Sequence, residues 1–308
     1  MKVLVTGSHG LIGGALIAQL LAGGHQVTTL VRGGHAGADE AAWDPAAGTI
    51  EADKLEGHDA VVHLGGVGIG DHRWTDEHKR AVLDSRVQGT ALLARTLAGL
   101  DAPPAVLASG SAVGFYGAAH GDEELTETDP PGTGFLADVV TRWEEAAAPA
   151  TDAGIRVAWI RSGVVLSAVG GALKKQLLPF KAGIGGRIGT GRQWLSWVSV
   201  DDEIAAIIHV LTTAAVHGGV NVTAPQPVTN AEFTATLARV LRRPAVIPVP
   251  TPALRLLFGA EMVKEMMLGG QRVLPARLQA SGFAFAYPGL EGALRHLLER
   301  PLPERLER

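Results

Sequence analysis

The 308-residue chain contains no cysteine. Disulfide bonds, zinc sites built on thiolates and cysteine nucleophiles are therefore excluded, and we predict no metal site. Charged residues make up only 19% of the chain and the formal net charge is −4, without a basic stripe, so we expect no nucleic-acid partner. No apolar run approaches the roughly 18 residues of a membrane span, so we expect no membrane partner either.

The chain also lacks a recognisable signal peptide. Its first residues, MKVLVTG, lead into an apolar run only a few residues long, which is typical of a buried strand. Apolar residues make up 46% of the composition, enough for a well-buried core. We therefore expect a globular, cytoplasmic protein.

Short apolar runs alternate with helical patterns through the first part of the chain. Strands are predicted at 2–6, 25–32, 60–64, 105–109 and 155–161, and helices at 11–23, 84–100 and 135–148. This alternation is typical of parallel strands joined by right-handed helical crossovers. The predicted fold class is α/β, a doubly wound parallel Rossmann sheet with a smaller C-terminal substrate lobe.

The pattern changes near residue 165. A glycine-rich segment at 181–194 indicates a loop or hairpin, and a helix at 202–211, a strand at 220–224 and a helix at 229–241 follow. The last of these helices opens on Thr229-x-x-Glu232, the spacing of a capping box. We predict a nucleotide-binding domain at 1–165 and a lobe at 166–308, with 197–225 returning to the sheet.

A glycine triplet follows the first predicted strand. In VTGSHGLIG, Gly7, Gly10 and Gly13 are spaced three apart and open the first helix. Such a turn brings backbone close to a pyrophosphate and aims a helix N-terminus at its charge. The pattern favours a dinucleotide cofactor, and the alternative is a tight turn without a ligand.

The end of the second predicted strand indicates which dinucleotide binds. An NAD site places an acid about 20 residues past the glycines, where it bonds the ribose 2′-hydroxyl. That region here is LVRGG, with Arg32 and no acid beside it. An arginine pairs with a 2′-phosphate, so NADP is favoured over NAD. The alternative is an exposed arginine at a strand end.

Several motifs together resemble a known superfamily. They are the glycine loop, HLGG at 63–66, SGSAVGFYG at 109–117 and RSGVVL at 161–166. In order and spacing they are similar to the extended short-chain dehydrogenases/reductases, the NAD-dependent epimerase/dehydratase superfamily. WDP at 43–45, IGTGRQWLSWVSVDD at 188–202 and GQRVLPARLQASGFAFAYPGL at 270–290 resemble one atypical subgroup, the YfcH-like epimerase family proteins, nearly end to end.

The resemblance implies roles for individual residues. It places Gly7, Ser8, His9, Gly10, Leu11 and Ile12 at the pyrophosphate, Arg32 at the adenosine phosphate, Asp44 near the adenine, Leu64, Gly65 and Gly66 at the ribose, Arg161, Gly163 and Val164 beside the nicotinamide, and Ser109 and Ser111 where the superfamily keeps its catalytic serine. Each has a structural alternative. His9 is then a surface loop residue, Asp44 before Pro45 a turn former, and Ser111 a cap.

The stretch GFLADVVTRWEE, at 134–145, lacks what the superfamily uses for proton transfer. Members that move hydride carry Tyr-x-x-x-Lys on this helix, where tyrosine is the acid/base and lysine lowers its pKa. If Glu144 is the glutamate usual in that helix, the tyrosine position falls at Leu136 and the lysine position at Val140. Neither side chain has an ionisable group that could donate or accept a proton.

Two hypotheses follow for the function. The first is an NADP-dependent epimerase or oxidoreductase that acts on an unknown small molecule with an unusual proton donor, for which Ser111, Tyr116 or a water are candidates. Tyr116, one of only two tyrosines, has packing as its alternative role. The second is a non-catalytic NADP(H)-binding redox sensor or regulatory protein. The resemblance also implies a homodimer through helices 84–100 and 135–148.

Overall fold

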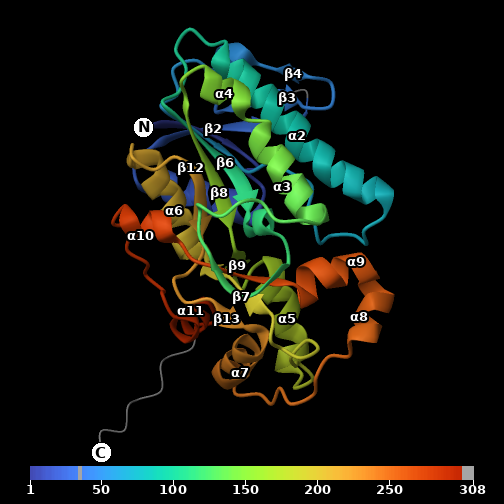
Figure 1. Cartoon of the computed structure of the whole chain (residues 1–308). Coiled ribbons are helices and arrows are strands. Elements are labelled where there is room, and N and C mark those ends of the chain that lie inside the picture. Colours follow the sequence, from blue (N-terminus) through green and yellow to red (C-terminus); the bar gives the residue numbers. More distant parts are fainter. Residues whose placement is uncertain (34–36, 300–308) are drawn as a thin grey trace, which may run out of the picture.

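An eight-stranded sheet forms the centre of the molecule, in the order β12–β8–β6–β5–β1–β2–β3–β4 (Figure 1). The computed structural model describes residues 1–33 and 37–299. The strands are β1 (Lys2–Thr6), β2 (Gln26–Val31), β3 (Glu40–Asp44), β4 (Thr49–Ile50), β5 (Ala60–His63), β6 (Val106–Ala112), β8 (Arg156–Ser162) and β12 (Gly218–Val222). All pair in parallel except β3 with β4. The predicted doubly wound α/β fold is confirmed.

Helices cover both faces of this sheet because successive strand residues point to opposite sides. Val3 and Val5 of β1 pack with α1 (Leu11–Ala22) and α6 (Val200–Thr212) on one face. Leu4 packs on the other face with α2 (Asp76–Ala98) and α4 (Ala148–Asp152). The helix α3 (Phe135–Glu145) lies beside α2 (Figure 1). The chain winds outward from β1 in both directions, which leaves a topological switch point between β1 and β5.

Some predicted elements have different ends, for local reasons. The helix predicted at 84–100 begins at Asp76, because the Thr75 side chain accepts a hydrogen bond from the backbone N–H of His78 and caps it. The helix predicted at 135–148 ends at Glu145. The capping box of Thr229 and Glu232 is confirmed at the start of α7 (Asn230–Leu241).

The C-terminal part packs around a cluster of its own. Trp197 and Phe233 are at its centre, with α5 (Gly171–Lys181), α7 and α11 (Leu290–Leu297) around them. Short strands extend this part: β9 (Val164–Leu166) pairs with β11 (Trp197–Ser199), β10 (Trp194–Leu195) with β13 (Val228–Thr229), and β7 (Ala119–Leu125) with β14 (Gly270–Val273). The remaining helices are α8 (Thr251–Phe258), α9 (Ala260–Met262), a π-helical turn (Val263–Leu268) and α10 (Ala276–Ala280).

β12 comes from the segment 197–225 and pairs with β8, as the edge strand of the large sheet. The division of the chain at residue 165 stays a prediction. Among the described residues, no helix combines the length and the apolar character that a membrane crossing requires.

Candidate cofactor site

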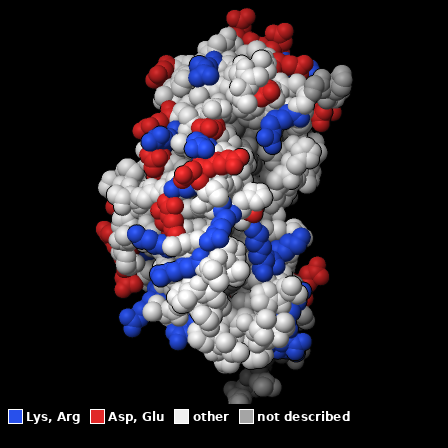
Figure 2. Space-filling view, turned by 90° about the vertical axis from the view of Figure 1, so that its right-hand side faces the viewer, with Lys and Arg blue, Asp and Glu red and all other residues white. Residues whose placement is uncertain are grey.

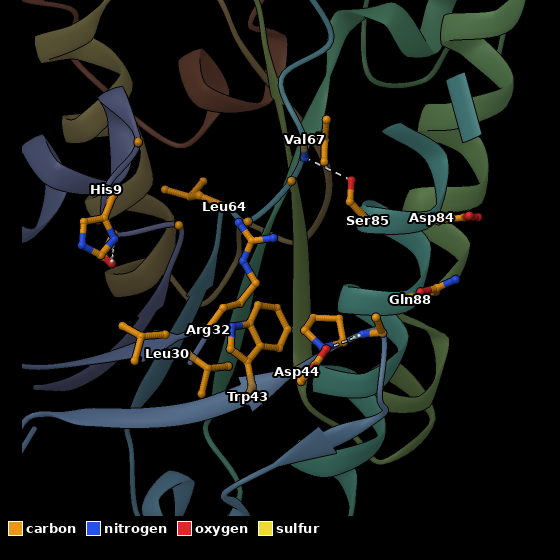
Figure 3. Close-up of a pocket in the computed structure, with 18 residues that line it drawn as sticks. His9, Leu30, Arg32, Trp43, Asp44, Leu64, Val67, Asp84, Ser85 and Gln88 are labelled. Carbon is orange, nitrogen blue, oxygen red and sulfur yellow. Dashed lines mark hydrogen bonds between the residues drawn. The ribbon is translucent and has the colours of Figure 1, made fainter. Parts of the chain in front are cut away.

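A cavity of about 670 Å³ opens at the carboxyl ends of β1, β2, β3 and β5 (Figure 3). This is the edge of the sheet where doubly wound folds bind ligands, and the volume is in the range of small-molecule sites. The lining residues are Gly7, Ser8, His9, Gly10, Leu30, Val31, Arg32, Trp43, Asp44, Pro45, Ala46, Leu64, Gly65, Gly66, Val67, Asp84, Ser85 and Gln88. Nine of the predicted cofactor residues line it: Gly7, Ser8, His9, Gly10, Arg32, Asp44, Leu64, Gly65 and Gly66.

The glycine loop forms one wall of the cavity. The physical reason for a glycine differs among its three positions. Gly7 has a φ of +70°, and a Cβ there would lie 2.8 Å from the backbone of Leu64. A Cβ on Gly13 would lie 2.2 Å from the carbonyl oxygen of Gly7. Gly10, in contrast, has extended backbone, and its Cβ would meet only that oxygen, at 3.2 Å. The turn therefore requires glycine at positions 7 and 13, where a side chain would collide with backbone. At position 10 the lack of a side chain leaves room for a ligand beside the loop.

Helix α1 begins at this wall without a side-chain cap. Gly10 is its N-cap, so no serine, threonine or aspartate accepts hydrogen bonds from the first N–H groups. Uncapped N–H groups at a helix N-terminus suit an anion. Leu11 and Ile12, also predicted at the pyrophosphate, form the first turn of α1 and do not line the cavity.

Arg32 directly follows β2, and its side chain reaches into the cavity. Figure 3 shows the guanidinium inside the cavity, beyond the ring of Trp43. Asp44, at the end of the neighbouring strand β3, accepts the backbone N–H groups of Ala46 and Ala47 with Oδ1, at 3.0 and 3.1 Å. Asp44 therefore builds the turn after β3 as well as lining the cavity. In the sequence, Arg32 lies between Val31 and Gly33, so neither neighbour is acidic.

A buried hydrogen-bond network holds the segment 64–66. The hydroxyl of Thr6 accepts the backbone N–H groups of Leu64 and Gly65, each at 3.0 Å. Its own hydrogen is then free to bond Nδ1 of His63, 2.7 Å away. Burial lowers the pKa of His63 to about 4, and the nearby charge of Arg86 adds to the effect, so the ring is neutral. A neutral ring leaves Nδ1 as an acceptor and lets Nε2 donate to Thr90, at 3.0 Å.

Three residues of helix α2 complete the opposite wall, and they had no predicted role. They are Asp84, Ser85 and Gln88. The hydroxyl of Ser85 accepts the backbone N–H of Val67 at 3.1 Å, as Figure 3 shows. The neighbouring Arg86 donates to the carbonyl of Val67 at 2.9 Å. The sequence motifs assigned no role to Ser85 or Arg86, because side chains that hold a distant loop leave no local pattern.

The remaining predicted residues lie in a different place. Ser109, Ser111, Tyr116, Arg161, Gly163 and Val164 do not line the cavity. Ser109 is fully buried, and a Cβ on Gly163 would lie 2.5 Å from the carbonyl oxygen of Ser196. Val164 pairs with Trp197 between β9 and β11. Gly163 lies between β8 and β9, which pack closely against the segment around Ser196. This close packing accounts for the glycine at position 163.

Ser111, Tyr116 and Arg161 belong to one buried network. Arg161 donates from Nε and Nη2 to the two carboxylate oxygens of Glu144, both at 2.8 Å. Its Nη1 donates to the hydroxyl of Tyr116 at 3.1 Å, and that hydroxyl donates to Asn221 at 2.8 Å. Burial raises the pKa of Tyr116, against the opposing effect of Arg161. Ionisation of this tyrosine is therefore disfavoured in the folded protein.

Helix α3 carries apolar side chains at the two positions predicted to correspond to the superfamily's tyrosine and lysine. Val140 is 4% exposed and packs in a cluster with Phe115 and Tyr116, and Leu136 is half-buried. The N-terminus of α3 is held by Glu265, whose carboxylate accepts the backbone N–H groups of Phe135 and Leu136 at 3.0 and 2.9 Å. The C-terminal part therefore caps the helix on which the superfamily places its acid/base.

Comparisons with known proteins agree with this architecture. Residues 3–223 match the model of the NAD dependent epimerase/dehydratase family, and residues 249–297 match a domain of unknown function, DUF1731. Epimerase family protein Mb2239 of Mycobacterium bovis is 42% identical over 299 residues, which cover 97% of this chain and 98% of that protein. Epimerase family protein SDR39U1 of Homo sapiens is 38% identical, over 97% of this chain and all of the relative (100%).

Solved structures show the same likeness. The crystal structure of human epimerase family protein SDR39U1 with NADPH aligns with a TM-score of 0.88 and 37% identity, over 97% of this chain and 99% of that one. A nucleoside-diphosphate sugar epimerase from Corynebacterium glutamicum aligns with a TM-score of 0.81 and 38% identity, over 99% of this chain and 59% of that one. The resemblance inferred from the sequence motifs is confirmed. The chain belongs to the NAD-dependent epimerase/dehydratase family, in which it resembles the epimerase family proteins of the SDR39U1 type.

Proposed function

We propose that this protein binds NADP(H) in the cavity beside the glycine loop and acts on an unknown small molecule as an epimerase or oxidoreductase. One observation carries the choice of cofactor: the Arg32 side chain enters the same cavity that Gly7 and Gly10 line. A guanidinium there pairs with a 2′-phosphate, which NAD lacks. The NADPH in the structure of human SDR39U1 supports the proposal.

The residues present fit the proposed cofactor. The uncapped start of α1, with Gly7, Ser8, His9 and Gly10, would hold the pyrophosphate. Trp43 and Asp44 would lie beside the adenine, and the segment 64–66 beside a ribose. The fit depends on the open side of Gly10, where a larger side chain would enter the cavity.

When bound, NADP(H) supplies or accepts a hydride, and the protein must move the matching proton. We propose that Leu136 and Val140 occupy the places of the superfamily's tyrosine and lysine. Neither moves a proton, so another group must do so. Ser111 and Tyr116 stay the side-chain candidates, and both hydroxyls are bonded to buried partners. Either would need to leave its partner to reach a substrate.

The same burial favours a second function, a non-catalytic NADP(H)-binding sensor of redox state. In that case the network of Arg161, Glu144, Ser111 and Tyr116 is structural, and the cofactor itself is the signal. NADPH oxidation with a panel of carbonyl compounds separates the two functions. Turnover supports the enzyme, and tight NADPH binding without any turnover supports the sensor.

The unit 166–308 is proposed as the substrate lobe, although the structure describes it only to residue 299. A homodimer through α2 and α3 is proposed as well, and light scattering after gel filtration tests it.

The decisive test of the cofactor is titration calorimetry of the wild-type protein with NADPH and NADH. We expect NADPH to bind more tightly, and equal affinity for the two would contradict the proposal.

A further inference from the structure

Exposed apolar side chains are concentrated on two segments of the C-terminal part that contact each other, and we treat these segments as one face. Among the described residues, ten large apolar side chains are exposed; Leu21 lies on α1, Val169 follows β9, and Met266 lies in the π-helical turn next to α8. The other seven are Leu178, Ile184, Val246, Ile247, Leu256, Leu257 and Phe258, with exposed fractions from 38% to 84%. Single exposed apolar residues are ordinary, but a collection of this kind marks a contact surface.

Two segments far apart in the sequence form this face. The loop after α5 lies against the segment before α8, through a bridge between Ile188 and Val249. The backbone N–H of Val249 donates to the carbonyl of Arg187 at 2.8 Å. Helix α8 follows, and none of its residues is buried. Figure 1 shows α8 at the outer edge of the molecule, away from the large sheet. The apolar side chains of α8 therefore project from the body.

The charges on these segments all have one sign. Residues 171–200 contain five lysines and arginines, residues 233–260 contain four, and neither segment contains an aspartate or glutamate, although the whole chain carries −4. Figure 2 shows the same division, with basic side chains spread over the lower part of the molecule and most acidic ones above. Five exposed cations lie among or beside the apolar residues: Lys174, Lys181, Arg187, Arg243 and Arg255. Among the described residues, none of these five forms an ion pair.

We call the seven apolar residues and five cations the apolar–basic face. Its positive charge indicates which class of partner it can bind. A second copy of the chain would bring the same cations against each other, because a two-fold interface joins identical patches. A bound peptide needs a groove. Neither the cofactor cavity nor the hollow lined by Tyr287 and His296 includes a residue of this face. Projecting Leu and Phe side chains among cations match an anionic lipid surface instead.

We propose that the apolar–basic face binds the surface of an anionic lipid bilayer. Leu256 and Leu257, which are neighbours on α8 and 77% and 66% exposed, enter the boundary between headgroups and acyl chains, while Arg255 and Arg243 contact lipid phosphates. The expectation of no membrane partner depended on the lack of a spanning segment, and binding at the bilayer surface needs no such segment. The cofactor cavity does not include any of these residues, so cofactor binding and lipid binding are separable.

Vesicle flotation of the full chain tests the proposal. We expect the protein to float with vesicles of phosphatidylglycerol and phosphatidylcholine, and not with vesicles of phosphatidylcholine alone. The double variant Leu256→Asp, Leu257→Asp should bind anionic vesicles at least about tenfold more weakly, because both side chains lose apolar burial. Leu21→Asp, at a side chain 56% exposed on α1, is the matched control and should bind like wild type.

The electrostatic part has its own variants. Arg243→Glu with Arg255→Glu should weaken binding at least about tenfold, since each basic residue near an anionic surface contributes about fivefold. Lys2→Glu, at an exposed lysine of β1, should have no effect. Higher salt should release the wild-type protein.

Unchanged thermal unfolding shows that each variant is folded. If the double aspartate variant unfolds, Leu256→Ser replaces it. Three outcomes overturn the proposal: no binding of wild type to anionic vesicles, equal loss in the control variants, or self-association of wild type that Leu256→Asp abolishes. The last outcome would assign this face to a dimer.

Discussion

The hydroxyl of Ser111 donates a hydrogen bond of 2.6 Å to Oε1 of Glu144, a residue of helix α3. The same carboxylate forms a two-point ion pair with Arg161, and the side chains of this pair are 6% and 9% exposed. A serine at the carboxyl end of β6 is where the superfamily resemblance implies catalysis. Here it is joined to a buried carboxylate that is already bound by an arginine, which makes it part of the connection between β6, α3 and β8.

Glu144→Ala should therefore destabilise the protein strongly. It would leave the Arg161 guanidinium buried without its counterion, which typically costs about 3–5 kcal/mol of unfolding free energy. Ser111→Ala removes only one hydrogen bond and should cost about 1 kcal/mol. Urea denaturation measures both. The control is Asp138→Ala, in an ion pair with Arg142 whose side chains are about half exposed, which should change stability by less than about 1 kcal/mol. If Ser111→Ala abolishes turnover in a stable protein, the hydroxyl is catalytic after all.

Arg32→Asp should weaken NADPH binding about ten- to hundred-fold. The variant loses charge-assisted hydrogen bonds to the 2′-phosphate and adds a repelling carboxylate. NADH affinity should change much less, because NADH has no 2′-phosphate. Calorimetry with both cofactors measures the two constants. Arg95→Asp, on an exposed part of α2 outside the cavity, should leave both unchanged. A loss of NADH binding as large as that of NADPH would mean that Arg32 acts on the fold instead of on the phosphate.

Gly10 and Gly13 should separate ligand binding from folding. Gly10→Val puts a branched side chain beside the loop with its Cβ 3.2 Å from the carbonyl oxygen of Gly7, so NADPH binding should be lost with only a moderate loss of thermal stability. Gly13→Ala would place a Cβ 2.2 Å from the carbonyl of Gly7, so it should destabilise the loop and the whole domain. Calorimetry and thermal unfolding of both variants test this pair. Intact NADPH binding by a folded Gly10→Val protein would contradict the site.

Wild-type protein should be nearly inert towards simple ketones and secondary alcohols. General acid–base catalysis contributes roughly 10²–10⁴-fold, and Leu136 and Val140 supply none of it. Leu136→Tyr is at a half-buried position and should fold. Adding Val140→Lys would bury an ammonium group among Phe115 and Tyr116, so the double variant should be destabilised by several kcal/mol. NADPH oxidation and urea denaturation test both effects. Brisk wild-type turnover would show that another group transfers the proton.

Glu203 should make stability depend on pH. It is fully buried, its Oε1 accepts from Ser162 at 2.5 Å, and its Oε2 has no hydrogen-bond partner among the described residues. Burial raises its pKa to about 8, so the folded protein holds a proton that the unfolded chain loses above its ordinary value of 4.5. The stabilising contribution is complete below pH 4.5 and falls as pH rises through about 8, by at most about 5 kcal/mol.

Glu203→Gln should remove that dependence, because the amide stays neutral. The difference in unfolding free energy between this variant and wild type, measured in urea at pH 5, 6.5 and 8, should grow with pH in favour of the variant. Taking the difference cancels the contribution of His63, whose depressed pKa of about 4 acts in the opposite direction. Glu145→Gln, on an exposed residue of α3, is the control and should show a difference that does not vary with pH. A constant difference for Glu203→Gln would mean that this carboxyl is ionised in the folded protein.

Local patterns were enough to predict the fold class. Apolar runs such as KVLVT and the glycine triplet depend on neighbouring residues only, and the strands and the first helix formed where these patterns indicated. Helix ends were less certain. The start of α2 at Asp76 depends on a single cap by Thr75, which carries little weight beside the periodicity of a long helix.

The sequence by itself determined the βαβ winding, the glycine turn and the arginine at the end of β2, because each follows from residues close together in the chain. Only the tertiary structure decided that Ser111 and Tyr116 are bonded to Glu144 and Asn221, and that Glu265 caps α3. It also decided that two distant segments that carry exposed apolar residues lie against each other. These contacts join residues far apart in sequence, and whether a polar side chain faces a cavity or a buried partner is settled only when the packed elements bring such residues together.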